Sequence, residues 1–388
     1  MDIITGSRED LIEMLNTAIK QGKKIKRNTD RIAMYNYVGN LYGALNVNGY
    51  EDYPVNYTDW FLKERNYKKF LKEVGIMGRQ FGSHFVQHKK FHNDYMHDVL
   101  SFYEEKMQEL GNVPESKESK YLGKEKFFEI LFGFLSKYGL EKEFREFLNK
   151  KRIFFKVRKN ENDDYLGLTV FNPIDRDVAI LIAHADYDFD TLFTLIHEFG
   201  HVIDLSFFKG DNISQVSIDY AYKSYYPEVY SRVLERLFIH YLVEEDIVKE
   251  LGIDKYIECM LIGHDYFIST YMYSLLDDRH FLGSDGLNIT EDEFYNEVVK
   301  SFKSDQFVKE FIEEEKLCFG ADMVYTYGDL LSTHLIEPVL ADGLDCIEMR
   351  QFMDVRTDSF DPEFLIKNGY DVKHYEKVFT KEVDLCKK

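Results

Sequence analysis

Cysteine and proline are both scarce in this chain of 388 residues. None of the four cysteines belongs to a Cys-x-x-Cys pair. In a chain of this size, that pattern argues against a disulfide framework and is typical of reduced intracellular thiols. The six prolines are too few to support long structureless linkers, and 45% of the residues are hydrophobic. The composition therefore predicts a folded protein of one or more lobes.

Positive charge is also in short supply. Lysine and arginine total 49 against 69 aspartates and glutamates, which gives a net charge of −20. This balance opposes binding to a nucleic-acid backbone, which requires a basic surface. No apolar run approaches the length of a membrane span, and the first ten residues do not resemble a signal peptide. We therefore expect a cytoplasmic protein without a nucleic-acid or membrane partner.

The most informative feature that is present is the pentapeptide His-Glu-Phe-Gly-His at residues 197–201. On a helix, His197 and His201 lie four positions apart and share a face, so both imidazoles can bind one divalent metal ion. Glu198 then faces the water molecule that the metal activates. The pattern predicts His197 and His201 as metal ligands and Glu198 as the general base of a zinc peptidase.

The same five letters also arise by chance, so the surrounding sequence has to decide. Large apolar residues flank the motif on both sides, which predicts a helix that is buried on most of its surface. Two histidines and a glutamate on a buried helix are costly unless another group satisfies them. A metal ion satisfies them, and this favours the metal site over a chance match.

A catalytic zinc site needs a third protein ligand and an open fourth position. The best candidate is Glu228, which begins a segment with helical spacing of apolar residues after Pro227. Glu235 lies seven residues later on the same face, and we interpret it as a second carboxylate that orients a histidine ligand. The alternative to a ligand role for Glu228 is a surface helix with scattered acidic residues.

Asp204 lies seven residues after His197, where it either orients a ligand imidazole or faces solvent at the end of the helix.

These segments together resemble the thimet oligopeptidase and oligoendopeptidase F family. Residues 193–201 are similar to its Thr-Leu-x-His-Glu-hydrophobic-Gly-His motif, and residues 228–235 to the Glu-Val-x-Ser-x-x-x-Glu of the oligoendopeptidase F branch. Residues 167–171 and 179–183 resemble the strand pair before the family's catalytic helix. The likeness covers about residues 120–345 of a chain that is short for the family.

The resemblance implies one Zn²⁺ per chain and an endopeptidase that acts on short or unstructured peptides. It also implies tyrosines in a late segment that stabilise the oxyanion, which makes Tyr325 and Tyr327 the candidates here. The family has a histidine in this segment at the position where the present chain has Ala321. That difference supports an alternative, a degenerate peptidase fold that binds peptides or a partner without cutting them. The intact Glu198 favours the enzyme.

The expected fold is mainly α-helical, with two helical lobes flanking a cleft and one small antiparallel sheet before the catalytic helix. We place a reduced N-terminal helical lobe at residues 1–115 and the zinc-peptidase region at residues 116–388, with the boundary in a Gly/Pro-bearing loop. Periodicity and turn signals predict the elements. Helices are expected over 7–27, 30–47, 59–110 and 124–150 and from 188 nearly to the end, with strands over 153–157, 166–171 and 178–183.

Overall fold

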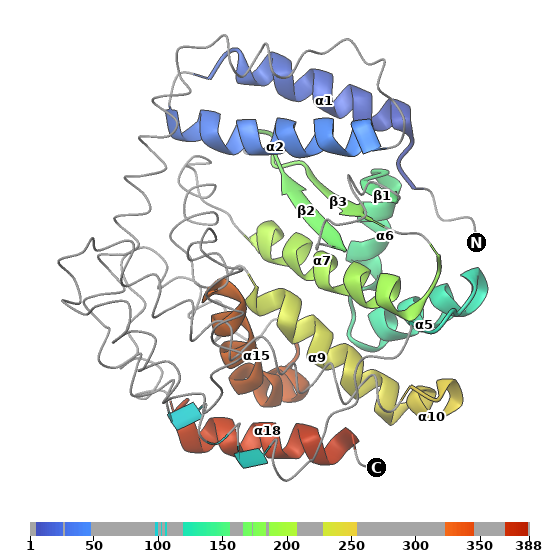
Figure 1. The fold of residues 1–388 in the computed structure, drawn as a ribbon, viewed down its shortest axis with the longest axis vertical. Helices are drawn as coiled ribbons and strands as arrows, with labels where there is room; N and C mark the ends of the chain where they lie inside the picture. The colour runs from blue at the N-terminus through green and yellow to red at the C-terminus, as the bar shows by residue number, and fades with distance from the viewer. Residues whose placement is uncertain are drawn as a thin grey trace, which may run out of the picture.

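The computed structural model describes the helical and strand framework of the chain (Figure 1). The described residues are 5–25, 28–47, 98–99, 102, 105–106, 119–155, 166–172, 174–183, 186–207, 228–253, 323–344 and 369–386. The elements are α1 (Arg8–Gly22), α2 (Asn28–Val47), α5 (Lys124–Lys137), α6 (Glu141–Asn149), β1 (Ile153–Phe155), β2 (Gly167–Phe171), β3 (Val178–Ile182), α7 (Phe189–Phe207), α9 (Val229–Glu244), α10 (Ile247–Leu251), α15 (Met323–Asp342) and α18 (Val372–Cys386).

The described part of the chain is mainly helical with one small sheet, which confirms the predicted fold class. Helix α1 begins after Ser7, whose side chain forms a capping box with Asp10. The predicted helix over 124–150 is divided into α5 and α6, because the chain turns at Gly139 with a φ of 70°. Most of the predicted helix over 59–110 lies outside the described residues. None of the described helices is long and apolar enough to cross a membrane.

The three strands form where the sequence predicts them, but the antiparallel arrangement is wrong for one pair. The strand order is β1-β3-β2, with β2 antiparallel and β1 parallel to β3. A short turn after Phe171 forces β2 and β3 to run in opposite directions. β1 has no such link to β3, so it adds to the other side in the parallel direction. Alternating apolar residues predict a strand but carry no information about its direction.

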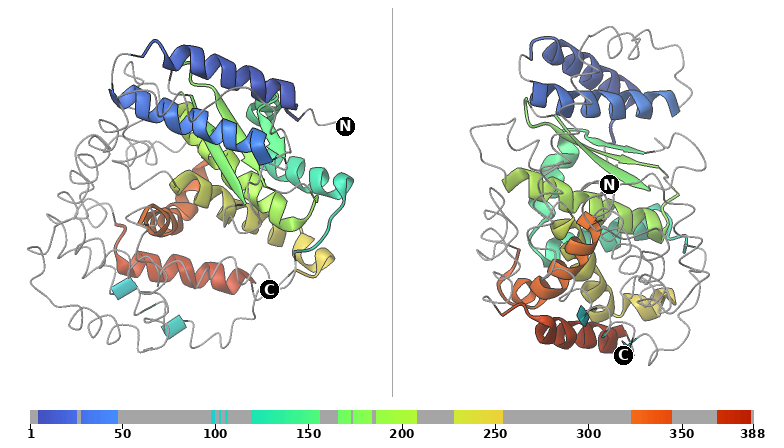
Figure 2. Two further views of the ribbon diagram at one scale, coloured as in Figure 1. Left: turned by 45° about the horizontal axis from the view of Figure 1, so that its top comes forward. Right: turned by 60° about the vertical axis from the view of Figure 1, so that its left-hand side comes forward.

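The sheet lies between α1 and α2 on one face and α7 on the other (Figure 1). Ala179 and Leu181 of β3 pack with Phe154 and Val170 against α1 and α2. Ile180 and Ile182 point to the opposite face and join the larger core around α5, α6, α7 and α9. The strand is therefore buried on both faces, which explains why the sequence Val-Ala-Ile-Leu-Ile has no polar residue. Figure 1 shows the order α1/α2, sheet, α7, α9 and α18, and both views of Figure 2 agree with it.

The predicted lobe boundary at residue 115 lies outside the described residues and stays a prediction, as does the cleft between the lobes. Helices α1 and α2 belong to the predicted N-terminal lobe, yet they share a hydrophobic core with all three strands. The first two helices therefore form one face of the layer that supports the candidate site.

Helices α7 and α9 cross at very short distance because Gly200 has no side chain. A Cβ atom at Gly200 would lie 2.5 Å from the Cα atom of Ser231, which is backbone and cannot rotate away. Gly200→Ala is expected to lower the free energy of unfolding by ~1–3 kcal/mol through overpacking, measured by urea denaturation. The matched control is Gly43→Ala in α2, since no described atom lies within 4 Å of that Cβ position. The control is expected to raise stability by ~0.5–1 kcal/mol, and equal effects of both variants would refute the close crossing.

Buried His334 of α15 pairs with half-buried His374 of α18, and this pair predicts acid sensitivity. His334 Nδ1 lies 2.9 Å from His374 Nδ1. Burial, followed by the neighbouring His374 and Arg236, lowers the pKa of His334 from 6.5 to about 3. Between these two pKa values, His334 is protonated in the unfolded chain and neutral in the folded chain. The free energy of unfolding therefore falls as the pH falls, by up to ~1.4 kcal/mol per pH unit.

His334→Gln is therefore expected to lose less stability than the wild type between about pH 6.5 and pH 4, because glutamine does not titrate. Urea denaturation at several pH values measures the difference. Parallel stability curves for the two proteins would assign the acid sensitivity to other groups.

Candidate metal centre

Helix α7 carries the His-Glu-x-x-His motif into the middle of the fold. Its apolar residues, among them Leu195, Ile196 and Phe199, are buried in the main core. This packing fixes the helix between the sheet and α9, as the sequence predicts for a helix that is apolar on most sides. The polar side chains of Glu198 and His201 are nevertheless buried as well, so both depend on partners inside the protein.

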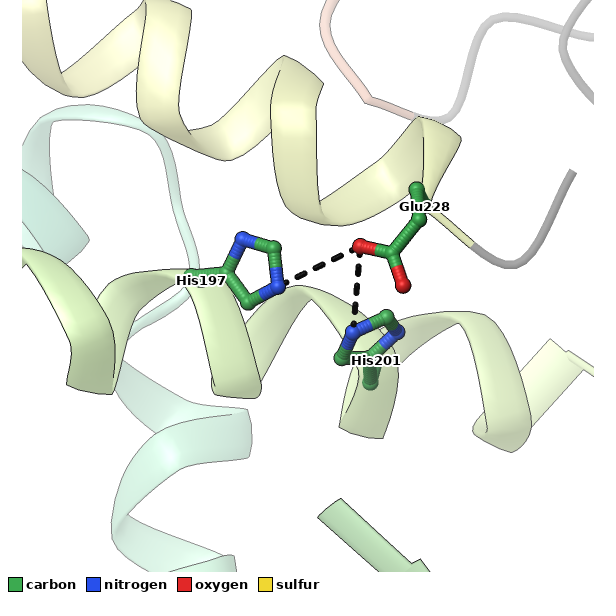
Figure 3. A group of neighbouring side chains, drawn as sticks. All are labelled: His197, His201 and Glu228. Carbon is green, nitrogen blue, oxygen red and sulfur yellow. Dashed lines mark ion pairs between the residues drawn. The ribbon is translucent and has the colours of Figure 1, made fainter. Parts of the chain in front are cut away.

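Glu228, at the N-cap position of α9, meets both histidines of α7 (Figure 3). Its Oε2 atom lies 3.3 Å from His197 Nε2 and 3.5 Å from His201 Nε2. The three side chains offer ligand atoms that all lie within 4.8 Å of one another, so together they could hold a metal ion. Ligands about 2.1 Å from a tetrahedral zinc ion lie about 3.4 Å apart, which agrees with both contacts.

The surroundings of Glu228 provide a second sign that a cation fits here. Among the described residues, no donor is placed in hydrogen-bond geometry toward Glu228 Oε2, although this atom is fully buried. The two imidazole nitrogens pair with it at 3.3 and 3.5 Å without good hydrogen-bond alignment. A buried carboxylate oxygen that lacks a well-aligned partner is costly. The same oxygen is the one aimed at the two imidazoles (Figure 3). A cation held by all three residues would satisfy it.

Glu235 contacts His197 from the other side of the ring. Its Oε1 atom lies 2.7 Å from His197 Nδ1, while Arg232 Nη1 donates to its Oε2 atom at 2.8 Å. With Nδ1 bonded to a carboxylate, Nε2 is the ring nitrogen left for a metal ion. Glu235 therefore lies where the sequence expects a carboxylate that orients a histidine ligand.

The pKa values of these side chains show that the surroundings of His197 favour positive charge. Burial by itself would lower the pKa of His197, but Glu235 and Glu228 outweigh it and raise the value to about 10. Burial raises the pKa of Glu228, but the two histidines and Arg232 more than offset it and keep that pKa below its usual value. Burial also opposes ionisation of Glu235, yet Arg232 and His197 lower its pKa to about 2. Two ionised carboxylates thus surround His197, and they attract a proton or a metal ion.

Strand β2 fixes Glu198 through two residues that the sequence analysis missed. The hydroxyl group of Thr169 lies 2.7 Å from Glu198 Oε2 and 3.0 Å from the backbone oxygen of Glu198. Two positions earlier on the same face, a Cβ atom at Gly167 would lie 2.8 Å from Glu198 Oε1. The glycine gives the carboxylate room and the threonine orients it. The sequence signal that could have identified them is a glycine and a threonine two positions apart in the strand before the motif.

If Glu198 acts as the general base that the sequence predicts, Thr169→Val is expected to reduce turnover less than loss of Glu198 itself, because it removes the oriented hydroxyl group and keeps the carboxylate. The separate variant Thr169→Ser keeps the hydroxyl group and is expected to retain most of the wild-type turnover. Metal content, measured by atomic emission, should be the same in both variants, since Thr169 contacts none of the three candidate ligands among the described contacts. Equal turnover in the valine and serine variants would leave Thr169 a packing residue.

The remaining predicted residues fall into two groups. Asp204 is buried in the last turn of α7, which excludes the solvent-facing alternative, and its role beside the ligands stays a prediction. Tyr325 and Tyr327 lie in the first turns of α15, where their side chains are outside the described residues. The helix itself is near the site, because a Cβ atom at Gly328 would lie 2.5 Å from Glu228 Cβ.

Comparison of this chain with family models, with curated proteins and with solved structures gives no match. The residues of the site are therefore the basis for any functional inference.

Proposed function

We propose that this protein is a zinc-dependent endopeptidase that hydrolyses short or unstructured peptides. The observation that carries the proposal is the convergence of Glu228 with two histidines from another helix, next to a buried Glu198. A metal site by itself would need no such glutamate. The pair of an oriented carboxylate and a three-ligand site is the arrangement of metal-assisted peptide hydrolysis.

The donor set supports zinc. His197 and His201 would offer imidazole nitrogens once a metal ion displaces the proton from His197, and Glu228 one carboxylate oxygen. Three protein ligands is the number that catalytic zinc sites use. Cobalt and manganese also accept these ligands, so metal analysis of the purified protein is needed. When bound, the ion supplies Lewis acidity toward a water molecule and the scissile carbonyl group.

The residues around the three candidate ligands each have a proposed part in the reaction. Glu198 removes a proton from the attacking water and returns it to the leaving amine, with its carboxylate oriented by Thr169. Glu235 holds His197 in the ligating tautomer. Tyr325 and Tyr327 are the proposed donors to the developing oxyanion, an effect commonly worth ~2.7–4 kcal/mol per donor.

The edge of the sheet supports a peptide substrate. Within the described residues β2 is an edge strand, paired on one side with β3. Its residues Gly167 and Thr169 contact Glu198, so an extended peptide added to this edge would run beside the catalytic carboxylate. Backbone hydrogen bonds to an edge strand give affinity with little dependence on side chains, which suits an enzyme for unstructured peptides.

One observation favours the rival function, a protein of this fold that binds peptides without cutting them. Ala321 stands where the resembling family has a histidine in the oxyanion segment. A binding protein, however, has no use for a glutamate that is held in place by a dedicated hydroxyl group. We therefore favour the enzyme.

A single experiment separates the two functions. The purified protein is analysed for bound metal and incubated with a library of quenched fluorescent peptides, with and without a chelator. The proposal expects about one zinc ion per chain, cleavage of many peptides, loss of cleavage with the chelator and recovery with added zinc. Metal binding without cleavage of any peptide would favour the binding protein, and absence of metal binding would refute the zinc peptidase. The cytoplasmic location expected from the sequence remains a proposal, which four cysteines without a Cys-x-x-Cys pair support.

A further inference from the structure

A chain of alternating buried charges leads away from the metal centre. It begins at Glu235, which contacts His197, and continues through Arg232 to Asp329 on α15. From Asp329 it passes to Arg236, which bonds Glu382 on α18. All these side chains are buried or nearly so. The sequence gives no hint of it, because its members come from three helices.

Asp329 holds the middle of this chain. Its Oδ1 atom lies 3.6 Å from Arg232 Nε and 4.0 Å from Arg236 Nη2. The preceding residue, Gly328, is the point where α15 touches Glu228. One turn of α15 therefore contacts a candidate ligand directly and another candidate ligand through Arg232 and Glu235.

We propose that Asp329 is a positioning residue of the metal centre: by holding Arg232, it lets Glu235 keep His197 in the ligating orientation. The inference depends on the proposed metal centre, although not on peptide cleavage. The contact between Arg232 Nε and Asp329 Oδ1 is an ion pair longer than a hydrogen bond, so Asp329 holds that side of the guanidinium by charge attraction. The donor aimed at Glu235 is Nη1, on the opposite side of the guanidinium from Nε.

Charge acts in the same direction as geometry. Arg232 attracts the carboxylate of Glu235 and competes with His197 for it. Burial raises the pKa of Asp329, and Arg232 and Arg236 oppose that rise. In its ionised form Asp329 offsets part of the positive charge of Arg232, so Glu235 stays a good acceptor for the His197 Nδ1 proton. Loss of Asp329 would therefore loosen the arginine and weaken the bond that orients His197. Partners at this remove from a metal commonly change its affinity by ~10–100-fold.

The rival explanation is that the charges only join α9, α15 and α18. Arg236 supports it, since it also donates to Ser332 at 2.9 Å and ties α9 to both other helices. The two explanations differ in what happens at the metal. A purely structural network changes unfolding alone, whereas a positioning residue changes the ligand field of the bound ion in protein that remains folded.

The test compares Asp329→Asn with Glu382→Gln. Each variant replaces one carboxylate of this series of buried charges by its amide. Glu382, however, contacts Arg236 and lies at the end of the series farthest from His197. For both folded variants, the zinc dissociation constant is measured by competition with a chelator, and the cobalt(II) derivative is measured by visible absorption. We expect Asp329→Asn to bind zinc ~10–100-fold more weakly and to alter the cobalt spectrum, and Glu382→Gln to keep the wild-type affinity and spectrum.

A wild-type cobalt spectrum and zinc affinity in Asp329→Asn would overturn the proposal, and so would equal losses in both variants. Should Asp329→Asn fail to fold, Arg232→Lys keeps the charge but removes the planar guanidinium that faces both Glu235 and Asp329, and the same spectral change is expected; an unchanged spectrum overturns the proposal. A wild-type protein that binds metal without cleaving peptides would refute the proposed peptidase and leave this inference standing. A wild-type protein that binds neither zinc nor cobalt would overturn both.

Discussion

Glu198→Gln is expected to abolish nearly all peptide hydrolysis while the metal stays bound. Glutamine has the shape of glutamate but cannot take a proton from water, and general-base catalysis commonly contributes ~10²–10⁴-fold to the rate. Thr169 can still donate to the amide oxygen, so the buried side chain keeps its hydrogen bond. Turnover of a fluorescent peptide and zinc content of the same sample measure the two effects.

The comparison with Thr169→Val makes this experiment sharper. Both changes affect the contact between β2 and α7, but only Glu198→Gln removes the base. Turnover is expected to be highest in the wild type, lower in Thr169→Val and lowest in Glu198→Gln, with equal zinc content in all three. Full activity in Glu198→Gln would remove this residue as the base, even if the metal site were correct.

Glu228→Gln is expected to release the metal. The substitution removes the only carboxylate among the three candidate ligands and keeps the volume that α15 packs against at Gly328. The loss of zinc affinity should exceed the ~10–100-fold that is typical for a partner of a ligand. Competition with a chelator measures the affinity, and peptide cleavage should fall in proportion to the metal lost.

Two further variants provide zinc affinities with which Glu228→Gln can be compared. Glu235→Gln removes a carboxylate that contacts His197 Nδ1, and it should weaken zinc binding less than Glu228→Gln. Glu129→Gln removes an exposed carboxylate that pairs with Lys126, and it should leave zinc binding unchanged. The reverse order, with Glu235→Gln depleted of metal and Glu228→Gln intact, would exchange the two glutamates as ligands.

The sequence predicts α7 well because two independent signals coincide there. The apolar residues around His197 require a buried helix, and the spacing of His197 and His201 requires one helical face. Glu228 and Glu235 follow from the same reasoning, since α9 also shows helical periodicity and both residues lie on one face. Local spacing is sufficient when the residues that meet come from one or two regular helices.

Other features depend on contacts that local spacing does not encode. The parallel pairing of β1 with β3 is set by how the chain returns to the sheet, and the prediction of an antiparallel sheet was wrong there. Thr169 meets Glu198 because β2 packs across α7, 29 residues away in the chain. Asp329 meets Arg232 only because α15 packs against α9.

The amino-acid order by itself determined the helical character of the chain and the trio of two histidines and a glutamate, because helix periodicity and ligand chemistry are local properties. Packing of the layers decided the rest: which strand forms the edge, which hydroxyl group meets Glu198, and which buried charges stand behind His197. These are meetings between residues far apart in the chain. Only burial of the shared core, with its demand that every enclosed charge find a partner, brings them together.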